Sequence, residues 1–256
     1  MYRKIVLNFN INNFSKTIDI LDISLIINEL YNRGYILKPT IIEEKDNCFA
    51  ATLIIVDALN IENMIDEIKE ICPYEIEVQS KIGELVANAT KFCSCEQSCY
   101  YIVNPEYNFM VNCSMDSLLS CGDCGNQILW NSITEFTNEE RMMITYLQNV
   151  YDNLESLRLK SPYSDFCEKE IMNPFSRYNQ LAFKVCKLFE DKLNKPVYLL
   201  LKNPIDGIVN EEKKDLEYCP ICEKKLDGME NIKYIGLNKV KKVCHTCKIV
   251  LPSYFD

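Results

Sequence analysis

Histidine and glycine are scarce in this chain, and their shortage weighs against several classes of enzyme. The 256 residues contain one histidine and seven glycines. The glycines form neither a Walker-type phosphate loop nor a Gly-x-Gly-x-x-Gly turn, and the sequence has no Gly-x-Ser-x-Gly nucleophile elbow. An enzyme is therefore the least favoured class, with a carboxylate- or tyrosine-based site as the remaining alternative. We predict a non-catalytic protein.

Long hydrophobic runs are also missing. No apolar run reaches the roughly 18 residues that a membrane span requires. The first residues, Met-Tyr-Arg-Lys followed by IVLNFNI, alternate like a strand and lack the apolar core and cleavage site of a signal peptide. We therefore expect a cytoplasmic protein with no membrane partner. Its 48% of hydrophobic and 25% of charged residues are typical of a globular chain of one or two domains.

The chain also lacks an excess of positive charge. It is rich in cysteine instead. The net charge of −9 opposes non-specific adsorption to nucleic acid. The chain contains 14 cysteines, several of them in Cys-x-x-Cys pairs. Disulfides are disfavoured in a reducing compartment, so clustered pairs of this kind are better explained as metal ligands.

The first 84 residues follow strand and helix periodicities in turn. Strand patterns cover residues 5–11, 35–44, 48–56 and 74–78, and apolar helical stripes cover 20–31 and 61–71. Gly34 is placed to end the first helix, and Pro73 stops the second. The order strand-helix-strand-strand-helix-strand is the ferredoxin-like pattern, in which both helices cover one face of a four-stranded sheet.

The rest of the chain divides into a cysteine-rich part, a helical part and a tail. Thr137 and Glu140 can form a capping box at the start of a helical stripe, and a second helix is expected from about Ser176 to Leu193. A short buried strand, VYLLLKN, follows, and PIDGIVNEEKKD is the expected linker. We predict an α+β protein with three domains. They are a ferredoxin-like domain at 1–84, a zinc-knuckle module with a helical region at 85–205, and a C-terminal zinc ribbon at 206–256.

Two Cys-x-x-Cys pairs in the tail predict a zinc site. They are Cys219-Pro-Ile-Cys222 and Cys244-His-Thr-Cys247, and two such knuckles complete a tetrahedron around Zn²⁺. The gap between them is slightly longer than the roughly 15–20 residues usual for such sites. His245 is expected to point away from the metal. A redox-active pair is the alternative, but two matched pairs favour a metal.

A second set of cysteines predicts another zinc site. Cys93 and Cys95 form a Cys-x-Cys pair, and Cys121 and Cys124 flank Gly-Asp. A cysteine-rich buried loop without metal is the alternative reading. The cysteines that rival these ligands are Cys99 and Cys113. Those expected to be core thiols are Cys48, Cys72, Cys167 and Cys186. Four-thiolate zinc has no open position for water, so both predicted sites are structural.

The chain resembles an uncharacterised bacterial family that contains zinc ribbons and is described as a candidate for nucleic-acid binding. The resemblance depends on CSC at 93–95 and the YYIV that follows, SLLSCGDCG at 117–125, AFKVCKLFEDKLNKPVYLLL at 182–201, CPIC and CHTC. It implies one metal unit at Cys93, Cys95, Cys121 and Cys124, and another at the C-terminal four. Glu223 and Lys224 follow CPIC where the family tends to have glycines, which leaves the shape of that turn open.

Two kinds of macromolecular partner fit the sequence, and no small-molecule substrate is indicated. The stretch from Asn231 to Val250 contains no acidic residue, so it could contact phosphates and stack a base. The side chains that would do so are Lys233, Tyr234, Lys239, Lys241, Lys242 and Lys248. An ordinary solvated lysine face is an equally good reading. The alternative function is an inhibitor or immunity protein that neutralises a basic toxin or enzyme through its acidic surface.

Overall fold

The computed structural model describes residues 2–10, 20–36, 41–45, 48–56, 61–71, 78–86, 93, 95, 98–104, 118–128, 130, 133, 135–202, 217–235 and 238–253. The chain is a mixed α+β protein with two sheets, and it forms two compact units. The first unit comprises Met1–Ala89 and Asn131–Thr145, and the second comprises Thr90–Trp130 and Tyr146–Asp256. Among the described residues, no helix is both long enough and apolar enough to cross a membrane.

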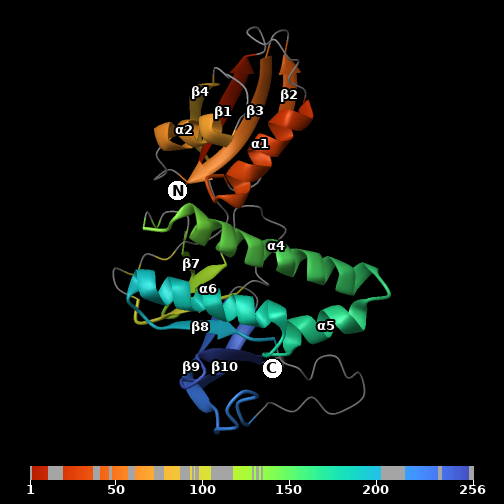
Figure 1. Ribbon diagram of the computed structural model, residues 1–256. Coiled ribbons are helices and arrows are strands. Elements are labelled where there is room, and N and C mark those ends of the chain that lie inside the picture. Colours follow the sequence, from red (N-terminus) through yellow and green to blue (C-terminus); the bar gives the residue numbers. More distant parts are fainter. Residues whose placement is uncertain are drawn as a thin grey trace. The chain divides into compact units, whose positions relative to one another are not determined.

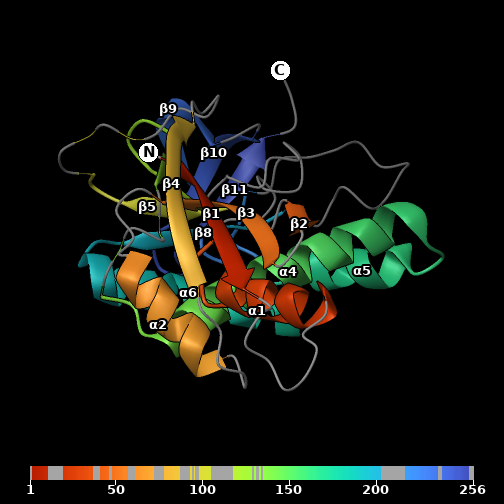
Figure 2. The same ribbon diagram turned by 90° about the horizontal axis from the view of Figure 1, so that it is seen from above.

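The first unit contains a four-stranded sheet in the order β2-β3-β1-β4 (Figures 1 and 2). Its strands are β1 (Tyr2–Asn10), β2 (Ile41–Lys45), β3 (Cys48–Val56) and β4 (Val78–Val86). All neighbouring strands are antiparallel. The fourth strand was predicted from Tyr74 to Val78. The structure shows it from Val78 onward, while Tyr74 and Ile76 lie outside the described residues.

Two helices cover one face of this sheet, α1 (Ile20–Asn32) and α2 (Ile61–Ile71) (Figure 2). Alternate residues of β1 and β3 point toward them, because side chains on a strand change face at every position. Together they form one apolar core: Ile5, Leu7, Phe9, Ile23, Ile26, Ile27, Leu30, Ile36, Phe49, Ala51, Leu53, Ile55, Met64 and Ile68. The predicted helical stripes therefore supply most of the buried side of each helix, although Ile20, at the start of the first stripe, is 45% exposed.

Gly34 ends α1, as predicted, with a left-handed φ of 72°. Its N–H donates to the carbonyl of Tyr31 at 2.9 Å, and the N–H of Tyr35 donates to Leu30 at 2.9 Å. This pair of bonds is the Schellman motif, which satisfies carbonyls that the end of a helix leaves open.

Glu67 on α2 lies at the centre of a polar group within the first unit. Its carboxylate accepts hydrogen bonds from the Arg33 guanidinium, from the Tyr35 hydroxyl at 3.1 Å and from the Asn138 amide at 2.8 Å. Burial acts to raise the pKa of Glu67, but these donors together outweigh it and hold the pKa below its ordinary value. The charged carboxylate thus links α2 to the residues that follow α1 and to Asn138.

The second unit contains a seven-stranded sheet in the order β7-β6-β5-β8-β11-β10-β9. The strands are β5 (Tyr101–Val103), β6 (Leu119–Cys121), β7 (Gln127–Ile128), β8 (Val197–Leu200), β9 (Asp227–Ile235), β10 (Asn238–Cys244) and β11 (Ile249–Ser253). β8 is parallel to both β5 and β11, and the other pairs are antiparallel. One sheet therefore runs across the predicted boundary between residues 205 and 206.

Three helices follow the cysteine-rich segment: α4 (Asn138–Lys160), α5 (Ser164–Met172) and α6 (Arg177–Leu193). The predicted capping box is present, since Thr137 N–H donates to the Glu140 carboxylate at 2.8 Å and Glu140 N–H donates to the Thr137 hydroxyl at 3.3 Å. The predicted second helix is α6, whose N-cap Ser176 accepts from the Asn179 N–H. Helix α5 was not predicted from the sequence. The predicted linker at 204–215 lies outside the described residues.

Glu155 on α4 is a buried charge in the second unit, with 1% of its surface exposed. Its carboxylate accepts from the Tyr151 hydroxyl at 2.8 Å, from Arg158 Nε at 2.6 Å and from Lys202 Nζ at 2.8 Å. Burial acts to raise the pKa of Glu155, but Lys202 and the other donors hold it below the ordinary value. The charge is therefore balanced by partners from α4 and from the chain that follows β8.

Candidate metal centres

Two groups of four cysteines bring their sulfur atoms together in the second unit. Within each group, all four sulfur atoms lie within 4.8 Å of one another. The first group is Cys93, Cys95, Cys121 and Cys124, and the second is Cys219, Cys222, Cys244 and Cys247. These are the two sets that the sequence indicated. Either group could hold a metal ion.

The rival ligands do not join these groups in the part of the chain that the structure describes. Cys99 is exposed, and its N–H donates to the Asp123 carboxylate at 2.6 Å. Cys113 and Cys72 lie outside the described residues. Cys167 and Cys186 are buried, as expected of core thiols, while Cys48 is only half-buried.

The three Cys-x-x-Cys segments share one hairpin geometry. In each, the residue before the first cysteine is paired across the hairpin with the third residue after the second cysteine. The pairs are Ser120 with Gln127, Tyr218 with Lys225, and Val243 with Val250. The same register places each cysteine pair in the turn of its hairpin. A turn of this kind points both sulfur atoms to one side, as a metal knuckle requires.

Backbone hydrogen bonds close these turns in the same way. The N–H of Cys121 donates to the carbonyl of Asn126, and that of Cys219 donates to Lys224, each at 2.8 Å. The corresponding residue after Cys244 is Ile249, with which it is paired between β10 and β11. The knuckles are therefore equivalent although their sequences differ at every position between the cysteines.

The residue after the second cysteine has a positive φ in all three knuckles. Gly125 has φ 74°, Glu223 has φ 58° and Lys248 has φ 53°. A non-glycine residue in this left-handed region costs roughly 1–2 kcal/mol. A glycine after CPIC is thus not required for the turn, because Glu223 adopts the same conformation.

Backbone N–H groups are directed at the first sulfur of each knuckle. Every such contact measures 3.4 Å. The donor and acceptor pairs are Asp123 N–H to Cys121 Sγ, Ile221 N–H to Cys219 Sγ, and Cys247 N–H to Cys244 Sγ. Donors of this kind favour the thiolate, which is the form of cysteine that binds metals.

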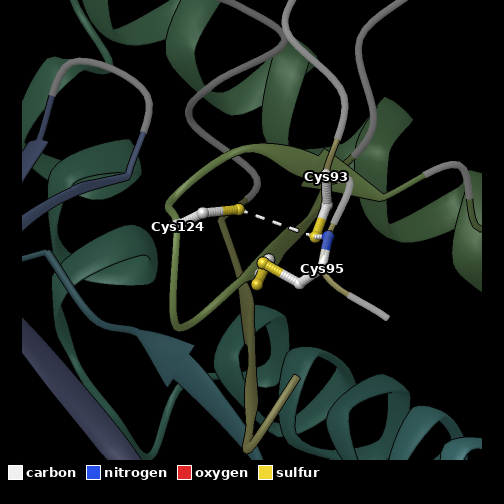
Figure 3. Close-up of side chains that lie close together, drawn as sticks. Cys93, Cys95 and Cys124 are labelled. Carbon is white, nitrogen blue, oxygen red and sulfur yellow. Dashed lines mark hydrogen bonds between the residues drawn. The ribbon is translucent and has the colours of Figure 1, made fainter. Parts of the chain in front are cut away.

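The fourth cysteine pair, Cys93 and Cys95, is built differently from the three knuckles (Figure 3). Cys93 and Cys95 are separated by one residue, and the N–H of Cys95 donates to Cys93 Sγ at 3.3 Å. The Cys93 N–H donates to the carbonyl of Gln127 at 2.9 Å, which holds this segment beside the β6–β7 hairpin. The Cys124 thiol lies 3.5 Å from Cys93 Sγ, as the dashed line in Figure 3 marks. Cys93 and Cys95 thus complete the first group.

One thiol in each group has a lowered pKa, and two others have raised ones. Burial acts to raise the pKa of Cys121, but hydrogen bonds led by the Ser98 hydroxyl, 2.9 Å from its sulfur, lower it to about 7. The Lys224 N–H is the main reason why the pKa of Cys222 is lowered to about 7. The pKa of Cys95 is raised to about 12, first by its hydrogen bond with Cys93. Crowded sulfur atoms resist a second negative charge, which a bound cation would compensate.

Both groups lie at the same end of the seven-stranded sheet. Cys121 is paired with Tyr101, the first residue of β5, and Tyr101 is paired with Val197, the first residue of β8. Ile249 begins β11, which is parallel to β8 and follows directly after the turn that ends at Lys248. Because these central strands all start at this end, the knuckles on either side of them lie at the same end of the sheet.

The predicted nucleic-acid contacts are only partly described. Lys248 lies against α6, where its ammonium group donates to the Glu190 carboxylate. Lys242 lies on β10 and is partly buried. The side chains of Lys233, Tyr234, Lys239 and Lys241 lie outside the part of the chain that the structure describes. One of the six predicted contacts is therefore already paired with an acid of the same chain.

Two side chains beside the centres were not identified from the sequence. Ser98 contacts Cys121, and the hydroxyl of Tyr198 lies 2.9 Å from Nδ1 of His245. His245 itself is exposed and is not part of the sulfur group, as expected. Ser98 is distant in the sequence from Cys121, and Tyr198 is distant from His245, and nothing in their local pattern marks them.

Comparison with known proteins identifies no relative. No family model, no curated protein and no solved structure matches the chain.

Proposed function

We propose that the chain is a non-catalytic zinc-binding protein in which two structural Zn²⁺ ions hold the second unit together. The observation that carries the proposal is the convergence of two sets of four sulfur atoms, each within 4.8 Å. Thiolates are soft ligands, and four of them in a tetrahedron are typical of zinc. Such a site keeps no position open for water, so its role is to stabilise the fold.

The strand order of the first unit supports a ferredoxin-like domain. Four antiparallel strands in the order β2-β3-β1-β4 alternate along the chain with helices α1 and α2 in the pattern of that fold. A fold of this kind is used for many functions, so it does not by itself assign one. The C-terminal hairpins with their cysteine knuckles support the zinc-ribbon part of the proposal.

Metal analysis of the purified chain tests the proposal. We expect elemental mass spectrometry to find about two zinc ions per chain when no metal is added during purification. The double variant Cys219→Ser/Cys222→Ser should retain one ion, and so should Cys121→Ser/Cys124→Ser. Cys99→Ser is the matched control, because this thiol is exposed and lies outside both groups. A chain that carries no zinc, or that loses zinc on Cys99→Ser, contradicts the proposal.

Nucleic-acid binding through the β9–β10 hairpin is the second candidate. It is supported by the absence of acidic residues from Asn231 to Val250, within an otherwise acidic chain. A salt-sensitive gel shift with single-stranded RNA should disappear in Lys239→Glu/Lys241→Glu. Lys187→Glu, an exposed lysine on α6, should leave it unchanged.

A partner pull-down separates this candidate from the alternative of an inhibitor or immunity protein. Co-purification of a basic protein in the absence of any gel shift would support binding through the acidic surface.

A further inference from the structure

Aromatic side chains connect the two cysteine groups across the end of the sheet. Gly122 lies in the Cys121–Cys124 knuckle and is in contact with Tyr100. Tyr100 contacts Tyr198 on β8, and Tyr198 contacts His245 in the Cys244–Cys247 knuckle. The chain of contacts thus starts inside one metal group and ends inside the other, within the second unit.

The first contact requires glycine. A Cβ atom at position 122 would lie 2.2 Å from the Tyr100 ring, which is closer than any real contact of this type. The Gly122 N–H also donates to the carbonyl of Tyr100 at 2.9 Å. The position of the Tyr100 ring is therefore fixed by the shape of the first knuckle.

The second and third contacts are equally specific. The rings of Tyr100 and Tyr198 meet edge to face, with centroids 5.6 Å apart and an interplanar angle of 79°. Edge-to-face contacts of this geometry are favourable beyond their buried area. The Tyr198 hydroxyl is hydrogen-bonded to Nδ1 of His245 at 2.9 Å. The two rings also meet edge to face, with their centroids 5.8 Å apart.

A small apolar cluster holds both tyrosines in place. Tyr100 and Tyr198 pack against four buried residues drawn from β5, β8, β10 and β11. These residues are Ile102, Leu200, Val243 and Val250. Val243 is also adjacent to the ligand Cys244, so the support of the tyrosines and the second knuckle share one strand.

We propose that the two centres bind zinc with positive coupling, transmitted through Tyr100, Tyr198 and His245. This inference rests on the proposed function, since it requires two zinc sites. An ion in the first group orders the knuckle that positions Tyr100, and through Tyr198 it orders His245 in the second knuckle. The second ion then meets a knuckle that has already lost its conformational freedom, so it binds more tightly. By linkage, each ion must strengthen the other by the same factor.

A pair of single-centre variants measures the coupling. Zinc affinity of the first centre is determined by competition with a chromophoric chelator, in the full chain and in Cys219→Ser/Cys222→Ser. The second centre is measured in the same way, with Cys121→Ser/Cys124→Ser. We expect each remaining centre to bind zinc about five- to 150-fold more weakly than in the full chain, by the same factor in both directions.

Variants that keep all eight thiols guard against loss of folding. Tyr198→Phe retains the ring but removes the hydroxyl bonded to His245, and Gly122→Ala displaces the Tyr100 ring. Both should reduce the cooperativity of zinc uptake, visible in native mass spectrometry as a larger share of chains with a single ion. Gly228→Ala is the matched control, because a Cβ there meets nothing within 4 Å. It should take up zinc as the unaltered chain does.

The outcomes separate the two proposals. A chain that binds two ions, with affinities that stay within about twofold when the other centre is removed, overturns the coupling and leaves the zinc function intact. Cooperativity that survives both Tyr198→Phe and Gly122→Ala overturns the proposed route. A chain that binds no zinc overturns the proposed function and the coupling with it.

Discussion

Each of the two units of this protein is stabilised internally, and the two differ in what stabilises them. In the first, strands β1 and β3 each span nine residues, and an apolar core is continuous between the sheet and helices α1 and α2. In the second, strands β5 to β8 span two to four residues each, and the sheet ends in cysteine knuckles. Each short strand buries little apolar surface in total, so cross-links at the strand ends would contribute more to stability. One chain thus has a continuous apolar core in one unit and, in part of the other, two cysteine groups that could hold metal ions.

Removal of metal should distinguish the two units most clearly. A structural zinc site contributes about 10 kcal/mol or more of apparent binding free energy, which the fold loses on chelation. We expect backbone amides of β6, β7, β10 and β11 to lose protection in hydrogen exchange when a strong chelator is present. Amides of β1 and β3 should keep theirs. Equal loss of protection in both units, or no loss in either, would contradict the division of roles.

Glu155 tests whether the second unit also depends on its buried charge. Removing one partner from a buried ion pair leaves the other charge uncompensated and costs about 3–5 kcal/mol. Glu155→Ala should lower the free energy of unfolding of the second unit by this amount, measured in urea with zinc present. Asp191→Ala, which removes an exposed acid of the same unit, should cost about 0.5 kcal/mol or less. Similar costs for the two variants would sink this interpretation.

Glu67 is the corresponding charge in the first unit, and it is less deeply buried. Glu67→Gln should cost about 1–3 kcal/mol at neutral pH, because hydrogen bonds to the charged carboxylate are lost. The pKa of Glu67 is lowered in the folded chain, so its stabilisation is present above the ordinary value near 4.3 and is lost as pH falls through the lower folded value. The difference in the free energy of unfolding between the unaltered chain and Glu67→Gln, measured in urea, should therefore shrink as the pH is lowered. A difference that grows at low pH would show that the carboxylate does not act as a charge.

The knuckles themselves give the smallest expected effects. Gly125→Ala places a side chain in the left-handed region and should cost about 1 kcal/mol. Glu223→Gly relieves the same strain at the matching position and should change stability by a gain of about 1 kcal/mol or less. Thermal unfolding of the zinc-loaded chain measures both. Opposite signs would support the equivalence of the knuckles, and equal losses would refute it.

The sequence predicted those features that depend on local patterns. The helical stripes, the Gly34 terminus, the Thr137–Glu140 capping box and the start of a helix near Ser176 all follow from residue type and spacing within one element. The membership of each cysteine group was also predictable, because paired spacing narrows the possible partners. These features require no knowledge of which distant segments meet.

Long-range pairing could not be predicted in the same way. β8 lies between β5 and β11, which begin 96 residues before it and 52 residues after it in the numbering of Tyr101, Val197 and Ile249. Nothing in VYLLLKN distinguishes a central parallel strand from an edge strand. The contact of Tyr198 with His245 depends on this placement, and so it could not be predicted either. Helix α5 was missed because its apolar residues are too few for a clear stripe.

The two sulfur groups differ in how far solvent reaches them. In the first, Cys95 and Cys124 are exposed, whereas the second contains no exposed thiol and buries both Cys219 and Cys244. An alkylating reagent or an oxidant arriving from solution therefore meets the first group earlier. Under oxidative stress, damage would begin at Cys95 and Cys124, and the thiols of the C-terminal group would react later.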